Sequence, residues 1–258
     1  MNILLNGISG FMGREVEKLC KASYRGASLL MGVDPMADKN SGAMVYNSFD
    51  EIESTSGVDC IIDFSHHTCT PELLKFAVQS NIPTVVCTTG HTEEELSDIK
   101  AASEKIPVFF AANMSLGVAL LVELAKKAAA AMPEADIEII EKHHNRKLDA
   151  PSGTALMIAD AICNVREGAY TKLGRAGQAK RTKEEIGIHA IRMGNIVGEH
   201  EVIIGTENQT ITLKHEAHSR ALFAEGAIAA ADFLYTKPAG LYDMNSLVGR
   251  EEKATVSV

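Results

Sequence analysis

The sequence predicts an α/β protein with a doubly wound parallel sheet in its N-terminal half and a second, open sheet after it. Short apolar runs alternate with helical patterns from residue 2 to residue 111, which is typical of a parallel sheet with helices on both faces. Three strand-like segments separated by turn residues then follow between residues 186 and 214. These two patterns predict two structural parts with different sheets.

Composition limits the class of protein. A chain of 258 residues with 46% hydrophobic content can form one large or two ordinary domains. Its net charge of -9 argues against nonspecific nucleic-acid binding. We find no apolar run long enough to span a bilayer and no targeting segment. The five cysteines are scattered, which is typical of reduced thiols, so we expect a cytoplasmic protein that binds neither nucleic acid nor membrane.

The first strand, turn and helix have the form of a dinucleotide-binding unit. The apolar run Asn2–Asn6 leads into Gly7, Gly10 and Gly13, after which apolar residues recur at helical spacing. The first glycine allows a tight turn, the second lets the backbone approach a pyrophosphate, and the third permits close helix–strand packing. The spacing is GxxGxxG and not the commoner GxGxxG, so a plain strand-to-helix turn is the alternative.

An acidic residue stands where a ribose-binding carboxylate is expected. Ser28–Val33 is predicted as the second strand, and Asp34 follows it directly. A carboxylate at this point favours an unphosphorylated ribose and repels a 2′-phosphate unless a cation intervenes. Lys39 is the nearest cation. The sequence therefore favours NADH and leaves use of NADPH open.

The remaining elements of the first half alternate in the same way. Expected strands are Cys60–Phe64, Thr84–Cys87 and Pro107–Ala111; one expected helix begins at Pro71 behind a Thr70 cap, and another begins with a capping box of Thr92 and Glu95 and reaches about Glu104. The carboxyl ends of parallel strands meet at one edge, so we expect residues 63–65, 88–90 and 111–114 to gather there.

Two adjacent histidines, His66 and His67, raise the question of a metal site. Neighbouring residues at a strand end point in different directions, and no nearby cysteine or third histidine completes a ligand set. We expect polar loop residues and no metal.

The stretch from residue 141 to residue 155 concentrates the chemistry. It follows an expected strand, Asp136–Glu141, and a Pro-Ser-Gly-Thr turn within it precedes an apolar helical pattern over residues 155–162. A helix N-terminus offers backbone N–H groups and the positive end of the helix dipole. Two adjacent imidazoles and three cations lie beside it, in a chain that is acidic overall. The cations are Lys142, Arg146 and Lys147. This reversal of charge predicts a site for a small anionic substrate.

Other elements frame this stretch. An alanine-rich helix, 116–132, is expected before it, with Ser115 as its cap. Residues 164–185 are rich in glycine and charge and are expected to form a solvated loop or a short helix. The expected strands of the second sheet are 186–193, 201–204 and 210–214, and a helical pattern returns over 220–235.

The stretch 142–155, KHHNRKLDAPSGTA, resembles the substrate-site motif of the 4-hydroxy-tetrahydrodipicolinate reductases, also called dihydrodipicolinate reductases, of bacterial lysine biosynthesis. The likeness continues along the chain in the family's order. Its further motifs are GISGFMG at 7–13, DFS at 63–65, TTG at 88–90, AANMS at 111–115, VGEH at 197–200, SR at 219–220 and LYDM at 241–244.

The resemblance implies an architecture. A Rossmann-type dinucleotide-binding domain comprises residues 1–114 plus 221–258, and an inserted α+β domain, 115–220, binds substrate and forms oligomers. In the family the open mixed sheet of the inserted domain builds a tetramer, so a homotetramer is expected. An insertion between two hinges could also close over the ligands.

The resemblance also implies site residues. Lys147 is the proton donor and His143 the proton donor or acceptor, while His144, Gly153 and Thr154 bind the carboxylates of a cyclic dicarboxylate substrate. An imidazole titrates near neutral pH, and an amine among cations can have its pKa lowered, so both suit proton transfer. The implied cofactor-binding residues are Gly7, Ile8, Ser9, Gly10, Phe11, Met12, Asp34, Cys87, Thr88, Thr89, Ala111, Ala112, Asn113 and Met114.

Three of these residues depart from the family's pattern. Phe11 stands where arginine is common, Cys87 where glycine is common, and Met114 where phenylalanine is common. Cys87 is expected to be a packing residue, with a thiol beside the nicotinamide as the alternative.

The implied reaction is reduction of 4-hydroxy-tetrahydrodipicolinate to tetrahydrodipicolinate, with loss of water, by NADH or NADPH. The residues also leave two alternative functions open. A different nicotinamide-dependent reductase of amino or imino acids would share the first half but would not need the 143–154 stretch in this form. A nucleotide-sensing protein without turnover would keep residues 7–13 and lose His143 and Lys147, both of which are present.

Overall fold

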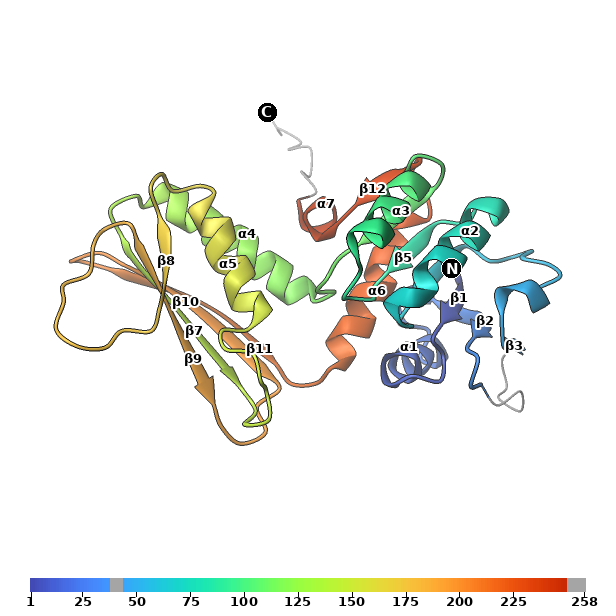
Figure 1. The fold of residues 1–258 in the computed structure, drawn as a ribbon, viewed down its shortest axis with the longest axis horizontal. Coiled ribbons are helices and arrows are strands. Elements are labelled where there is room, and N and C mark those ends of the chain that lie inside the picture. The colour runs from blue at the N-terminus through green and yellow to red at the C-terminus, as the bar shows by residue number, and fades with distance from the viewer. Residues whose placement is uncertain (38–43, 250–258) are drawn as a thin grey trace, which may run out of the picture. The chain divides into compact units, whose positions relative to one another are not determined.

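The computed structural model describes residues 1–37 and 44–249. The described chain forms two compact units, and each is a body of its own (Figure 1). The first unit combines Met1–Leu116 with the chain from Ala221 onward, and the second is Gly117–Arg220.

The first unit is built on a seven-stranded sheet in which every strand pair is parallel. The strand order is β12-β6-β5-β4-β1-β2-β3, so the chain reverses its direction of growth at β1. Its strands are β1 (Asn2–Asn6), β2 (Ser28–Val33), β3 (Met44–Tyr46), β4 (Cys60–Asp63), β5 (Thr84–Val86), β6 (Pro107–Phe110) and β12 (Gly240–Tyr242). The predicted doubly wound parallel sheet is confirmed, and the switch point where such sheets bind ligands lies between β1 and β4.

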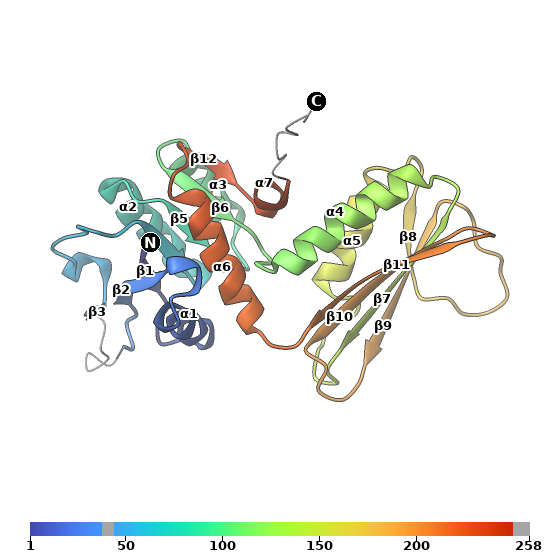
Figure 2. The same ribbon diagram turned by 180° about the vertical axis from the view of Figure 1, so that it is seen from behind.

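Helices cover both faces of this sheet. α2 and α3 pack on one face, over Leu4, Ile61 and Val86, and α1 packs beside α6 on the other (Figures 1 and 2). The helices are α1 (Phe11–Lys21), α2 (Thr70–Ser80), α3 (Glu93–Ser103), α6 (Ala221–Leu234) and α7 (Met244–Val248). Burial on both faces explains why the central strands are continuous apolar runs without alternation.

The predicted cap of α2 is wrong, whereas that of α3 is confirmed. The helix begins at Thr70 itself, behind Cys69, which makes no side-chain capping bond. The Thr70 hydroxyl is buried and hydrogen-bonded to His91 Nε2 at 2.9 Å, so it is engaged by tertiary structure. Thr92 and Glu95 form the expected reciprocal capping box of α3.

The second unit holds a five-stranded mixed sheet in the order β11-β10-β7-β9-β8. β10 is antiparallel to β7 and β11, and β9 is parallel to β7 and β8. The strands are β7 (Asp136–His143), β8 (Tyr170–Leu173), β9 (Glu185–Arg192), β10 (Gly198–Gly205) and β11 (Thr210–Ala217). α4 (Leu116–Ala131) and α5 (Gly153–Cys163) pack on one face and leave the other open, as the sequence predicts.

The expectation of a loop or short helix over residues 164–185 is wrong, because this stretch contains β8. The strand has only four residues, YTKL, and pairs on one side only, with β9. A short edge strand with no fully buried residue shows no alternation of apolar and polar side chains, so it carries no periodic signal. β3 and β12, also short edge strands, were missed for the same reason.

No helix among residues 1–37 and 44–249 combines the length and the apolar character needed to cross a membrane.

The glycine at position 13 gives a stability prediction. A Cβ there would overlap the Gly7 carbonyl oxygen and lie 2.7 Å from the Ile8 carbonyl oxygen. Both are backbone atoms, which cannot move without shifting the chain. We expect Gly13→Ala to lower the free energy of unfolding by about 1–3 kcal/mol because α1 must move away from the turn. Denaturant unfolding measures the change.

Arg14→Ala is the matched control, since Arg14 is the next residue of the same helix and is exposed. It should change stability by no more than about 0.5 kcal/mol. Equal effects of the two substitutions would contradict the proposed close packing.

Candidate functional site

The turn between β1 and α1 needs glycine for steric reasons. Gly7 has φ +82°, and a Cβ on it would lie 2.6 Å from the Phe64 carbonyl oxygen at the end of β4. Its N–H donates to the carbonyl of Val33 at 2.8 Å. The turn therefore lies against the carboxyl ends of both β2 and β4, at the switch point of the sheet.

Asp34 contacts this turn, as its place in the sequence predicts. One carboxylate oxygen accepts a hydrogen bond from the Ser9 N–H at 3.0 Å, and the other accepts from the Met36 N–H at 2.9 Å. The carboxylate thus joins the end of β2 to the glycine turn. Lys39, the cation expected to offset this charge, lies outside the described residues.

A buried carboxylate draws three strand ends together in the same region. Asp63 is 0% exposed; Oδ1 accepts from Asn6 Nδ2 at 2.8 Å and from the Ser65 hydroxyl at 2.6 Å, and Oδ2 accepts from the Thr88 hydroxyl at 2.7 Å. The expected gathering of residues 63–65 and 88–90 is confirmed. The role of Asn6 was missed, since a single polar residue at the end of an apolar run gives no signal of its partner.

The residues expected to bind the cofactor differ in how far they reach the surface. Gly10, Phe11, Thr89 and Ala112 are exposed; Ser9, Met12, Asp34, Ala111 and Asn113 are half-buried; Gly7, Ile8, Cys87, Thr88 and Met114 are buried. Met114 is 2% exposed and packs against Gly226 of α6, so its side chain belongs to the core of the first unit.

Cys87 has the surroundings of a packing residue. It is 7% exposed, and burial followed by the charge of Asp63 raises the pKa of its thiol well above the ordinary value. A thiol with a raised pKa is a poor nucleophile because little of it is ionised. The geometry favours packing over a reactive group beside the nicotinamide.

Of the two adjacent histidines, His67 joins its loop to the start of α3, whereas His66 bonds to Thr68 in the same loop. His67 Nδ1 lies 3.0 Å from both Glu95 carboxylate oxygens, and Glu95 also closes the capping box with Thr92. The rings of the two histidines are tilted by 38° to one another, with 4.3 Å between their centroids. Within the part of the chain that the structure describes, no group of histidine, cysteine and acidic residues is arranged to hold a metal ion.

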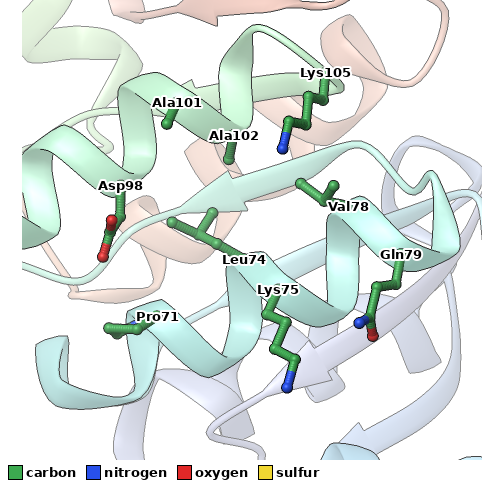
Figure 3. Close-up of a pocket in the computed structure, with 9 residues that line it drawn as sticks. All are labelled: Pro71, Leu74, Lys75, Val78, Gln79, Asp98, Ala101, Ala102 and Lys105. Carbon is green, nitrogen blue, oxygen red and sulfur yellow. The ribbon is translucent and has the colours of Figure 1, made fainter.

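A groove of about 380 Å³ lies between α2 and α3 of the first unit (Figure 3). Leu74, Val78 and Ala102 form its floor, with Asp98 and Lys105 at its border. None of the expected site residues lines it. The groove is therefore a feature of the first unit that is distinct from the glycine turn.

In the second unit, β7 brings a buried carboxylate to the expected catalytic stretch. Glu141 is 0% exposed and accepts a hydrogen bond from His143 Nδ1 at 2.5 Å and two from the Arg192 guanidinium, at 2.6 and 2.8 Å. A fourth comes from the Ser152 N–H at 3.0 Å. Glu141 and Arg192 were not among the expected site residues, because their pairing spans 51 positions.

His200 is a second buried imidazole beside His143. The two rings meet edge to face at 5.2 Å between centroids, and His200 Nε2 lies 3.1 Å from the Ser152 hydroxyl. Burial, and then the charge of His143, lowers the pKa of His200 to about 4, so this ring is neutral at physiological pH. The VGEH motif contained this residue, but nothing in its spacing indicated that it would reach the 143–152 segment.

Two of the three expected cations, Arg146 and Lys147, lie in the loop after β7. The expected place of Lys142 beside them is wrong, because Lys142 belongs to β7 and pairs with Glu199 at 2.9 Å. His144 is surrounded by Arg146, Arg220 and Lys147, and the pKa of its imidazole is lowered first by burial and then by these cations. Lys147 Nζ pairs with the Asp149 carboxylate at 2.8 Å. A half-buried imidazole among cations is a good receptor for an anion, which would relieve their mutual repulsion.

The helix that follows begins where an anion could bind. Ser152 is the N-cap of α5, and its hydroxyl accepts from the Ala155 N–H at 3.3 Å. Gly153 and Thr154 are the first helical residues, and a Cβ on Gly153 would meet no atom within 4 Å. The predicted helix start is confirmed; it presents backbone N–H groups and the positive end of the helix dipole.

Comparison with known proteins identifies the family. The model described as dihydrodipicolinate reductase, N-terminus, matches residues 1–114, and that of the C-terminus matches residues 117–248. A 4-hydroxy-tetrahydrodipicolinate reductase of Caldanaerobacter subterraneus subsp. tengcongensis is 46% identical, over 96% of this chain and 98% of the relative. One of Clostridium tetani is 42% identical over 96% and 97%. The chain belongs to the dihydrodipicolinate reductase family.

Similar solved structures support the same family. The dipicolinate-bound dihydrodipicolinate reductase from Paenisporosarcina sp. TG-14 has a TM-score of 0.81 and 25% identity, over 95% of this chain and 98% of that one. A DAP dehydrogenase of C. glutamicum, with a TM-score of 0.57 and 15% identity, shares the fold alone. Members of this reductase family are NAD(P)H-dependent oxidoreductases of lysine and diaminopimelate biosynthesis, and so is this chain. Membership of this family argues against both alternatives, another reductase and a nucleotide sensor.

Cysteine reactivity tests the packing of the first unit. Because its thiol is buried and its pKa is raised, Cys87 should stay unmodified when the native protein is treated with iodoacetamide at pH about 8. Cys69, which is half-buried, is the internal comparison. Peptide mass spectrometry measures both. Labelling of Cys87 at the rate of Cys69 would indicate a reactive thiol.

Proposed function

We propose that this member of the dihydrodipicolinate reductase family reduces 4-hydroxy-tetrahydrodipicolinate to tetrahydrodipicolinate, and that the loop from His143 to Thr154 performs the chemistry on the substrate. The observation that carries the proposal is the meeting, in one loop of the second unit, of buried His143, cation-surrounded His144, Lys147 and the start of α5. A hydride and a proton enter the ring and one water leaves.

The first unit fits a nicotinamide dinucleotide. Gly10, the N-cap of α1, is exposed and carries no side chain, so a pyrophosphate can approach the backbone there. Asp34 stands at the end of β2, where a ribose hydroxyl can donate to it. The bound cofactor supplies the hydride. The negative charge of Asp34 disfavours a 2′-phosphate, so we propose that NADH is the better cofactor and that NADPH is also used.

The second unit would hold the substrate by its two carboxylates. His144 with its neighbouring cations offers a charged partner, and the N–H groups of Gly153 and Thr154 offer hydrogen bonds at the positive end of α5. The dipicolinate in the related structure named above is itself a dicarboxylate, which supports this class of ligand.

Two side chains in the same loop can move a proton. The Lys147 side chain is 24% exposed and is held by its ion pair with Asp149 in the same loop, so its ammonium group is both positioned and accessible. His143 is hydrogen-bonded through Nδ1 to Glu141, which leaves Nε2 for exchange. We propose Lys147 as the proton donor and His143 as proton donor or acceptor.

The open face of the second sheet supports self-association as a homotetramer. Along β7 and β10, buried residues alternate with less buried ones, and the buried residues, which include Ile137 and Val202, lie under the helices. The opposite face includes Ile140 and the ion pair of Lys142 with Glu199, at 2.9 Å. Such an uncovered sheet is a natural surface for a second copy. The five unpaired cysteines support a cytoplasmic location.

Turnover tests the proposed donor. With freshly made substrate, consumption of NADH or NADPH followed by absorbance gives kcat for both cofactors. We expect Lys147→Ala to lower kcat by about 10²–10⁴-fold, the contribution of a positioned acid, with cofactor binding unchanged.

Lys142→Ala is the control, since Lys142 lies in the same stretch but pairs with Glu199 on the open sheet face. Its kcat should stay within a few-fold of that of the parent chain. Lys147 is not the donor if its own substitution has an equally small effect.

Proton uptake tests the substrate subsite. The pKa of His144 is lowered in the free protein, so the ring is neutral at pH about 7; a bound dianion favours the charged form and raises this pKa. Dipicolinate should therefore bind with net proton uptake, and more tightly as pH falls. Calorimetry in two buffers of different ionisation enthalpy measures the uptake.

In His144→Asn the proton uptake should disappear, and the affinity should lose its dependence on pH in this range. Unchanged uptake in that variant would assign the proton to another group.

A further inference from the structure

Glu141 occupies a position that the proposed chemistry does not yet explain. Its two buried oxygens accept four hydrogen bonds: Oε2 from His143 Nδ1 and Arg192 Nη1, and Oε1 from Arg192 Nη2 and the Ser152 N–H. The carboxylate thereby joins the end of β7 and the end of β9 to the N-cap of α5. A simple structural ion pair would not need a histidine and a helix cap as additional partners.

The charge state of Glu141 decides where the proton of His143 lies. Burial acts to raise the pKa of Glu141, but hydrogen bonds from Arg192, from His143 and from the Ser152 N–H lower it below its ordinary value. The carboxylate is therefore ionised at neutral pH and can only accept hydrogen bonds. At 2.5 Å from it, Nδ1 must be the protonated nitrogen, and in neutral His143 the lone pair lies on Nε2.

A glycine leaves the space around that second nitrogen open. A Cβ at Gly198 of β10 would lie 3.1 Å from His143 Nε2 and 3.4 Å from Cδ2. Its φ lies outside the positive range that requires glycine, so the backbone itself would accept another residue. The requirement for glycine at this point is the space beside Nε2.

The same carboxylate also fixes the loop that carries Lys147. Arg192 Nη2, which binds Glu141, donates as well to the Asp149 carbonyl at 2.6 Å. The Asp149 side chain pairs with Lys147. One buried ion pair therefore determines the positions of the imidazole, the helix start and the lysine loop.

We propose that Glu141 is the positioning residue of the site: it holds His143 as the Nδ1–H tautomer with Nε2 facing the space that Gly198 leaves open. This proposal rests on the proposed role of His143 in proton transfer. Glu141 touches no substrate itself, and it acts by fixing which imidazole nitrogen exchanges the proton and where that nitrogen lies relative to the first turn of α5.

The tautomer of His143 is the decisive measurement. Solid-state NMR of the full chain labelled with ¹³C,¹⁵N-histidine distinguishes protonated from unprotonated ring nitrogens, and His143→Gln assigns the signal. We expect His143 to be the Nδ1–H tautomer in the parent chain and to lose that single state in Glu141→Gln. We also expect Glu141→Gln to lower kcat by about 10- to 100-fold, a part of what a positioned acid or base contributes, with KM for the cofactor unchanged.

Glu138→Gln is a matched control. Glu138 lies on the same strand and likewise binds an arginine and a histidine, Arg181 at 2.7 Å and His189 at 2.9 Å, but on the open face of the sheet. It should keep both the His143 tautomer and a kcat within about threefold of the parent value. An unchanged tautomer in Glu141→Gln, whatever its kcat, would overturn the proposal, as would equal kcat losses in the two variants.

Gly198→Ala tests the second half of the proposal, and it does so even if Glu141→Gln does not fold. The added methyl group crowds Nε2 and leaves the bond to Glu141 in place. We expect the tautomer to be kept while kcat falls at least about tenfold; full turnover would refute a role for the space at Nε2. Full turnover of His143→Gln would instead contradict the proposed function, so the two failures are distinguishable.

Discussion

Burying a carboxylate costs several kcal/mol, on the order of the stability of a small domain, unless donors surround its oxygens. Each unit of this chain buries one at the carboxyl end of a strand. Asp63 collects Asn6, Ser65 and Thr88 in the first unit, and Glu141 collects His143, Ser152 and Arg192 in the second. Because every donor must reach the same two oxygens, the segments that supply them have little freedom to move apart.

In the first unit this constraint shapes the edge of the sheet formed by the carboxyl ends of its strands. The side chains gathered by Asp63 come from the ends of β1, β4 and β5, and the glycine turn passes directly over the end of β4. A side chain on Gly7 would collide with backbone and not with another side chain, so the turn cannot adapt. Tight backbone packing at the switch point thus fixes the turn that leads into α1, where we propose that a pyrophosphate binds.

In the second unit the same constraint produces chemical asymmetry between neighbouring imidazoles. His143 is paired with a carboxylate, His144 lies among cations, and His200 is buried against His143 and Ser152. Three histidines within one site thus have three different electrostatic surroundings. Such differences allow one ring to exchange a proton, another to bind an anion and the third to stay neutral.

Most of the fold could be predicted because its signals are local. The apolar runs of β1, β2 and β4, the glycine spacing of the first turn and the capping box of α3 all lie within a few residues of one another. The predictions failed where a partner distant in sequence determines the local structure. Thr70 does not cap α2, because its hydroxyl is hydrogen-bonded to His91. β8 is a strand because it pairs with β9.

In the candidate site, too, features set by nearby residues could be predicted and contacts between distant residues could not. The sequence by itself determined the family, the parallel sheet, the place of Asp34 beside the glycine turn and the concentration of cations before α5, since each depends on residue types at short spacing. Only the tertiary structure decided that Arg192 binds Glu141, the carboxylate that contacts His143, and that His200 reaches Ser152 from another strand. The physical reason is that a buried charge selects its partners by distance in space, and strand pairing brings together residues that the chain keeps about fifty positions apart.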